Sequence, residues 1–141
     1  MYPPKPEAAE AKAWGWTVPL FKHYDGAGRV ALRVVRAGIK LGGFSSIHLH
    51  RYQSNTLHVV SGKLIVLQFH NGDDLELWPH SVLWAGDAVA IPANRRHKFL
   101  AVEDCEIYES YLSMPGLESD PDDIIRFTEN GCDPEQVLPH L

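Results

Sequence analysis

Three histidines form the group of residues in this sequence that is best suited to chemistry. His48 and His50 lie two positions apart in a strand-like segment, and alternate residues of a strand face the same side, so both imidazoles can contact one ion. His97 comes from a second strand-like segment far along the chain. Three neutral imidazoles leave coordination positions open for a substrate. The trio therefore predicts a site for a divalent metal ion, and Zn, Fe, Mn, Ni and Cu are all compatible with imidazole ligands.

The histidines belong to two segments that are punctuated by glycine. These read Gly42-x5-His48-x-His50-x4-Asn55-x6-Gly62 and Gly86-x5-Pro92-x4-His97. The first resembles the cupin motif G-x5-H-x-H-x3,4-E-x6-G, and the second resembles the cupin motif G-x5-P-x-G-x2-H-x3-N. The resemblance implies an all-β jelly-roll barrel, also called a double-stranded β-helix, with the metal held inside it.

The chain departs from the cupin motifs at Asn55, Asn94 and Ala101, where the family has glutamate, glycine and asparagine. Asn94 is a mild change because asparagine tolerates a positive φ. Asn55 removes the acidic ligand, so a three-histidine site keeps the full charge of its ion and attracts an anionic oxygen donor more strongly. The Asn55 amide, or that of Gln53, can still act as an additional ligand or as a donor. The alternative is a cupin that has lost its metal and its activity.

A second resemblance covers residues 13 to 131 and concerns the cupin domain of type II mannose-6-phosphate isomerases. Its motifs occur in the order Trp14-Gly15-Trp16, Arg33-Val34-Val35, Val59-Val60-Ser61-Gly62, Ile91-Pro92-Ala93 and Asp122-Asp123-Ile124-Ile125-Arg126-Phe127. This resemblance implies a sugar phosphate as substrate. The sequence, however, has no glycine-rich loop opening a helix and no cluster of arginines that would form a phosphate clamp.

The elements that must position the histidines are short β-strands. From Trp14 onward, apolar runs alternate with Gly, Pro, Asn or Asp at intervals typical of an all-β sandwich or barrel. The predicted strands are 15–22, 29–37, 44–49, 56–61, 63–70, 74–78, 81–84, 87–91, 96–103 and 105–112, with hairpin turns at Asp25-Gly26, Ser61-Gly62, Asn71-Gly72 and Glu103-Asp104.

The ends of the chain are predicted to be irregular. Residues 1–12 contain several prolines and are expected to form a flexible or surface-draped arm. Residues 13–131 form a single cupin domain, and 132–141 a tail that lies along the surface or a partner subunit. Segment 121–127 opens with proline and two aspartates, which suits a short C-terminal helical turn, although a turn into a last strand is the alternative.

Strand parity predicts which side chains line a pocket beside the metal. If His97 faces inward, Phe99 does too. Asn55 facing inward places Leu57 and Val59 on the wall below it. These residues form the expected substrate pocket together with one tyrosine from the next strand.

Two further pairs of residues have opposite parity. Tyr108 and Tyr111 point to opposite faces of one strand, so only one of them can contact the cavity, as a hydrogen-bond donor or as part of the core. Arg33 and Arg36 are likewise opposed, so that one of the two can project into the barrel and meet a substrate anion.

The bulk properties limit the possible partners. A chain of 141 residues with 22% charged residues and a net charge of −5 is ordinary for one globular domain and argues against binding to nucleic acid. The sequence has neither a secretory signal nor an apolar run of about 18 residues, so a cytoplasmic location away from membranes is expected.

Cys105 and Cys132 are expected to be free thiols. Unpaired edge strands favour a homodimer.

Two classes of function follow. The first is a metal-dependent enzyme, either isomerase-like or lyase-like or, with ferrous ion, a dioxygenase, that chelates a small oxygenated anion such as a carboxylate or a sugar derivative. The second is a non-catalytic cupin that binds a sugar or another small molecule.

Overall fold

The computed structural model describes residues 1–69 and 80–140. Within these ranges the chain forms thirteen strands and one 3-10 helical turn: β1 (Glu10–Lys12), β2 (Gly15–Tyr24), β3 (Val30–Ile39), β4 (Gly43–Phe44), β5 (His48–Leu49), β6 (Gln53–Ser61), β7 (Lys63–Phe69), β8 (His80–Trp84), β9 (Ala88–Ile91), β10 (Arg96–Ala101), β11 (Cys105–Ser113), β12 (Ile125–Arg126), β13 (Gly131–Cys132) and η1 (Pro134–His140). The predicted strand 74–78 and the Asn71-Gly72 turn lie outside the described residues.

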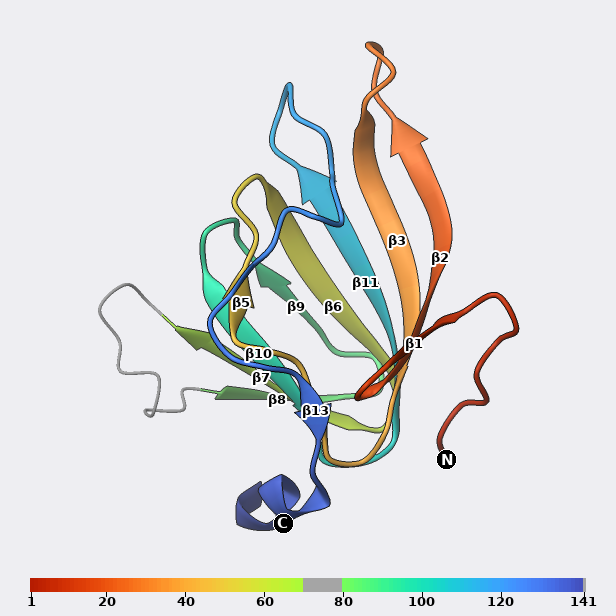
Figure 1. The fold of residues 1–141 in the computed structure, drawn as a ribbon, viewed down its shortest axis with the longest axis vertical. Helices are drawn as coiled ribbons and strands as arrows, with labels where there is room; N and C mark the ends of the chain where they lie inside the picture. Colours follow the sequence, from red (N-terminus) through yellow and green to blue (C-terminus); the bar gives the residue numbers. More distant parts are fainter. Residues whose placement is uncertain (70–79, 141) are drawn as a thin grey trace.

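Two antiparallel sheets form the molecule. One has the order β1-β2-β3-β11-β6-β9, and the other has the order β12-β5-β10-β4-β13, with β7 pairing β10 and β8. The long strands β3, β11 and β6 face the β5, β10 and β7 layer (Figure 1). This arrangement confirms the all-β jelly roll that the sequence predicts. No helix in the described part of the chain has the length and apolar character needed to span a bilayer.

Strand β7 shows how the core is divided. Leu64 and Val66 belong to the cluster that contains Trp14, Leu57, Phe99 and Ile107, whereas Ile65, Leu67 and Phe69 belong to a second cluster with Leu100 and Val137. Because strand residues alternate between faces, β7 is buried on both sides. Its uninterrupted apolar run is typical of such a strand.

The termini pack against the sheets. In the N-terminal segment, expected as an arm, β1 pairs with β2, and the Trp16 indole donates a hydrogen bond to the Pro3 carbonyl at 3.1 Å. Gly38 is required beneath this indole, since a Cβ there would lie 2.5 Å from the Trp16 ring. In the C-terminal segment, Val137 of η1 is buried in the second cluster.

Segment 121–127 does not form the helical turn expected of it. It makes a turn that leads into β12, which pairs with β5, so that Arg126 lies opposite His48. The C-terminal helical turn lies further on, at Pro134–His140. Backbone pairing with β5 satisfies peptide groups that an isolated single helical turn would leave open.

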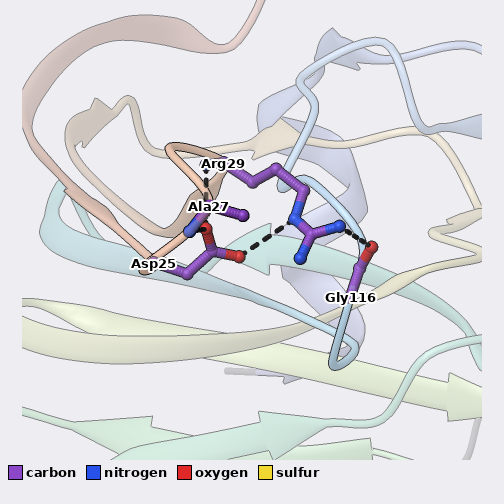
Figure 2. A network of polar contacts seen from close by, with 4 residues as sticks. All are labelled: Asp25, Ala27, Arg29 and Gly116. Carbon is purple, nitrogen blue, oxygen red and sulfur yellow. Dashed lines mark hydrogen bonds and ion pairs between the residues drawn. The ribbon is translucent and has the colours of Figure 1, made fainter.

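A polar network connects the β2–β3 turn with the loop that follows β11 (Figure 2). The Asp25 carboxylate accepts bonds from the Ala27 and Arg29 amides, both at 2.9 Å, and from the Arg29 side chain at 3.1 Å. Arg29 in turn donates to the Gly116 carbonyl at 2.9 Å. The loop after β11, which continues toward the histidines, is therefore anchored to the β2–β3 hairpin.

Candidate metal centre

Two neighbouring strands bring the histidines together. His48 on β5 is the direct cross-strand partner of His97 on β10, and His50 follows β5 immediately. One ring nitrogen from each histidine can be chosen so that the three atoms all lie within 4.8 Å of one another. The ring centroids are 4.3 Å apart for His48 and His97, 5.1 Å for His48 and His50, and 5.3 Å for His50 and His97. The structure thus places the predicted trio at one point.

The loop before β10 helps to fix this geometry. Asn94 has a φ of 67°, which is the positive value expected of the residue that replaces the motif glycine. The backbone amide of Asn94 donates a hydrogen bond to the His50 carbonyl at 2.7 Å. The turn that precedes His97 is therefore bonded directly to the segment that carries His50.

Backbone carbonyls orient all three rings. The Nδ1 atoms lie 2.8 Å from the Ser46 carbonyl for His48, 2.8 Å from the Asp123 carbonyl for His50 and 2.9 Å from the Arg95 carbonyl for His97. A carbonyl only accepts, so each Nδ1 carries the proton and each Nε2 holds a free lone pair. This second layer of contacts is typical of metal-binding histidines.

Two of these nitrogens have no protein partner. His50 Nε2 and His97 Nε2 are buried and make no hydrogen bond within the described chain. Buried polar atoms are almost always satisfied, because leaving one unpaired costs about 1–3 kcal/mol. A divalent ion bound by the three Nε2 atoms would satisfy them, so the residues present fit the metal that the motifs imply.

The rings are held in the protonation state that metal binding needs. Burial lowers the pKa of His48 to about 4, with a smaller contribution from the neighbouring His50. Burial also lowers the pKa of His50, and it lowers that of His97 well below the ordinary value, with His48 adding to the effect. At neutral pH all three imidazoles are therefore uncharged and able to donate a lone pair.

The two amide candidates differ in their surroundings. The Gln53 side chain donates to the Asp120 carbonyl at 2.9 Å and accepts from Ser119 Oγ at 2.7 Å. Its polar atoms are thus engaged in holding the 119–120 segment, which argues against a role as a ligand. Asn55 lines a small pocket with His48 and His97, and its amide makes only a 3.5 Å contact with the Ser110 carbonyl. Of the two, Asn55 is the one beside the histidines.

A main cavity of about 390 Å³ opens beside His48 and His50. Phe99 and Tyr111 line it, as does Arg33. This volume is at the lower end of the range of about 300–1,000 Å³ typical of small-molecule sites.

The other expected pocket residues lie elsewhere. Leu57 lines the small pocket, whereas Val59 is buried in the core cluster. Tyr108 lines neither cavity in the described part of the chain, because strand parity turns it away from the face that carries Tyr111. Arg36 is likewise turned away, and it forms an ion pair with Glu106 at 2.7 Å.

Glu109 is a site residue that the sequence reasoning missed. It lies on β11 two positions before Tyr111, lines both cavities and accepts a short hydrogen bond from the Tyr111 hydroxyl. Burial raises the pKa of the Glu109 carboxyl, and burial together with the neighbouring Glu109 raises the pKa of Tyr111 well above its ordinary value. The signal was available, since residues two apart on a strand share a face.

Asp123 is a second residue that the sequence did not single out for the site. Its carbonyl accepts from His50, and its carboxylate accepts from the backbone amides of Arg51 and Tyr52, each at 2.9 Å. Asp123 therefore fixes both the ring and the backbone of the His50 segment. No local pattern predicts this contact, because Asp123 is distant from His50 in the sequence.

Comparisons with known proteins identify the class of fold. No protein-family profile matches the sequence, and no curated protein sequence matches it significantly. Among solved structures, KdgF from Halomonas sp. matches with a TM-score of 0.59 and 19% identity over 74% of this chain and 84% of its own. CapF, a capsular polysaccharide assembling protein from Staphylococcus aureus, matches with a TM-score of 0.66 and 20% identity over 89% of this chain and 33% of its own.

Oxalate decarboxylase from Bacillus subtilis also matches, with a TM-score of 0.66 and 13% identity over 84% of this chain and 29% of its own. The chain therefore spans about a third of the CapF and oxalate decarboxylase chains. All three are proteins of the cupin fold, and this chain has that fold, as its motifs predict. The narrower resemblance to type II mannose-6-phosphate isomerases stays a prediction.

Proposed function

We propose that this protein is a metal-dependent enzyme that binds a small oxygenated anion and moves a proton on it, as an isomerase or a lyase does. The observation that carries the proposal is the pair of buried, unpartnered Nε2 atoms of His50 and His97. His48, His50 and His97 would hold the divalent ion. When bound, such an ion supplies Lewis acidity, polarising a substrate carbonyl.

Glu109 is the residue best suited to the proton transfer. Its carboxylate lies at the junction of the main cavity and the small pocket. Because burial raises its pKa, Glu109 is a stronger base than an exposed carboxylate and is easier to protonate at neutral pH. The Tyr111 hydroxyl donates to one carboxylate oxygen and fixes its orientation. The other oxygen can accept a proton from a carbon next to a carbonyl group and return it.

Two alternatives share the same residues. A ferrous ion at the three histidines would support a dioxygenase, but the buried carboxylate of Glu109 favours proton transfer. A non-catalytic cupin that only binds a sugar or another small molecule is supported by Asn55, which brings no acidic ligand to the histidines. The likeness to oxalate decarboxylase, whose name describes chemistry on a small carboxylate, supports a carboxylate-binding enzyme only at the level of the fold.

The first experiment measures metal content. Protein purified without chelator and analysed by plasma emission should contain about one equivalent of a divalent metal per chain. His97→Ala should lower the occupancy steeply, whereas His58→Ala, at an exposed position of β6, should leave it unchanged. Less than about a tenth of an equivalent, with no uptake of zinc, iron, nickel or manganese, would contradict the metal site.

The second experiment tests catalysis. Metal-loaded protein is incubated in D2O with D-mannose 6-phosphate and with D-gluconate, and the loss of the C2 proton signal is followed by NMR. Glu109→Gln should slow this exchange by about 100-fold or more while the metal occupancy stays the same. Metal binding without exchange on either compound would favour the non-catalytic alternative.

A further inference from the structure

Arg33 is a buried cation that forms no ion pair with any residue in the described part of the chain. The residue lies on β3 and is only 9% exposed. The Arg33 Nε donates to Ser119 Oγ at 3.0 Å, and the guanidinium carbon lies 4.4 Å from the centroid of the Tyr111 ring. The ion pairs among the described residues are Lys12–Glu10, Arg29–Asp25 and Arg36–Glu106, so none of them involves Arg33. Its two Nη atoms have no hydrogen-bond acceptor in residues 1–69 and 80–140.

Such an arrangement is unfavourable unless an anion completes it. A buried charge is costly to remove from water and is normally paired. Glu109 is close enough to interact electrostatically with Arg33 but lies beyond ion-pair distance, and it accepts its hydrogen bond from Tyr111 instead. Since Arg33 lines the main cavity, a bound molecule can reach the two free Nη atoms.

We propose that Arg33 binds the carboxylate of a small hydroxy acid, whose other oxygens face the histidines; this rests on the proposed function. The free Nη donors match a planar carboxylate, which can accept two parallel hydrogen bonds. Ser119 and the Tyr111 ring hold the guanidinium in place from two directions. The Tyr111 ring is also 5.4 Å from that of His50, so the anion site and the metal site share one wall.

The charge of the cavity favours a carboxylate over a phosphate. Arg33 is the only buried cation among the described residues that line the main cavity. Lys12 is already paired with Glu10, while Lys22 and Arg126, which also line the cavity, are exposed to solvent. A single buried guanidinium balances one negative charge, whereas a phosphate group carries up to two. The Trp14 and Phe99 rings, which also line the cavity, can pack against the carbon chain of the ligand.

The test compares two molecules that differ in one group. D-gluconate and D-glucitol have the same carbon chain, and only gluconate carries a carboxylate. Calorimetry on metal-free and zinc-loaded protein gives the ratio of their affinities, with inorganic phosphate as a third probe. Wild-type protein should prefer gluconate, and Arg33→Met should reduce gluconate affinity by about 10- to 100-fold with little change for glucitol. Arg33→Lys keeps the charge but loses the planar fork. Its gluconate affinity should therefore lie between that of the wild type and that of Arg33→Met.

Arg36→Met is the matched control, because Arg36 lies on the same strand but is ion-paired with Glu106 away from the cavity. It should leave gluconate binding unchanged. Zinc affinity, measured separately, should be the same in wild type and in all three variants, which shows that the variants are folded. If wild-type protein does not bind zinc, the proposed metal-dependent function is wrong, whereas the Arg33 inference is decided by the metal-free protein. That inference is overturned if metal-free wild type binds no gluconate, or if its affinities for gluconate and glucitol are about equal. It is also overturned if Arg33→Met leaves the ratio of these two affinities unchanged, or if phosphate binds more tightly than gluconate.

Discussion

Acidification should destabilise the metal-free protein, and His48 should account for a defined part of the loss. The pKa of His48 is about 4 in the folded protein, against 6.5 for an unperturbed histidine. Between these values the unfolded chain binds a proton that the folded chain does not. The contribution of neutral His48 to the free energy of unfolding is therefore fully present above pH 6.5 and is lost as the pH falls toward 4. At about 1.4 kcal/mol for each pH unit, His48 contributes about 3 kcal/mol to the free energy of unfolding at pH 7 relative to pH 4.

Urea unfolding in the presence of EDTA, repeated from pH 7 to pH 4, measures this contribution. Glu109 has a raised pKa, so its effect on stability has the opposite sign and must be separated. His48→Gln achieves this, because the difference between wild type and variant at each pH contains mainly the His48 term. His58→Gln, at an exposed position, is the control. A pH-dependent difference below about 1 kcal/mol would refute the assignment of His48 as a buried neutral imidazole.

Three further predictions concern the site and the cysteines. Asp123→Asn removes one acceptor from the Arg51–Tyr52 backbone and should weaken zinc binding by about 10-fold or more in a chelator competition assay; Asp122→Asn, exposed beside it, should not. Asn55→Glu should tighten zinc binding in the same assay, and an unchanged affinity would show that position 55 does not contact the ion. In the native protein, exposed Cys132 should react with a thiol reagent while Cys105 should not, since Cys105 is buried and burial raises its pKa to about 12; equal rates would contradict this difference.

The sequence predicts the fold and the histidine cluster well because both depend on local patterns. Glycine-punctuated motifs that resemble those of cupins, together with alternation along strands, predict that His48, His50 and His97 converge, and the structure brings them together. They also predict that only one of Tyr108 and Tyr111 lines the cavity. The parity inference needs no knowledge of which strands are neighbours, whereas the convergence of the histidines rests on the resemblance to the cupin motifs.

Other features depend on tertiary contacts and could not be read in the same way. Gln53 is engaged by Ser119 and Asp120, which lie far along the chain. The helical turn expected at 121–127 competes with backbone pairing to β5, and the pairing prevails. Parity alone also leaves open which of Arg33 and Arg36 faces inward, because the answer depends on the face of β3 that the second sheet covers.

The carbonyl contacts of the three rings have a consequence for mutational tolerance. Ser46, Arg95 and Asp123 orient the imidazoles through main-chain oxygens, and every amino acid supplies such an oxygen. Replacing any of these side chains leaves the acceptor itself in place, provided that the backbone keeps its path. The tautomers of His50 and His97 are thus protected against most substitutions at Asp123 and Arg95, whereas a substitution of Ser46 keeps the carbonyl acceptor of His48 Nδ1 but loses the hydroxyl that lies 3.1 Å from the same atom.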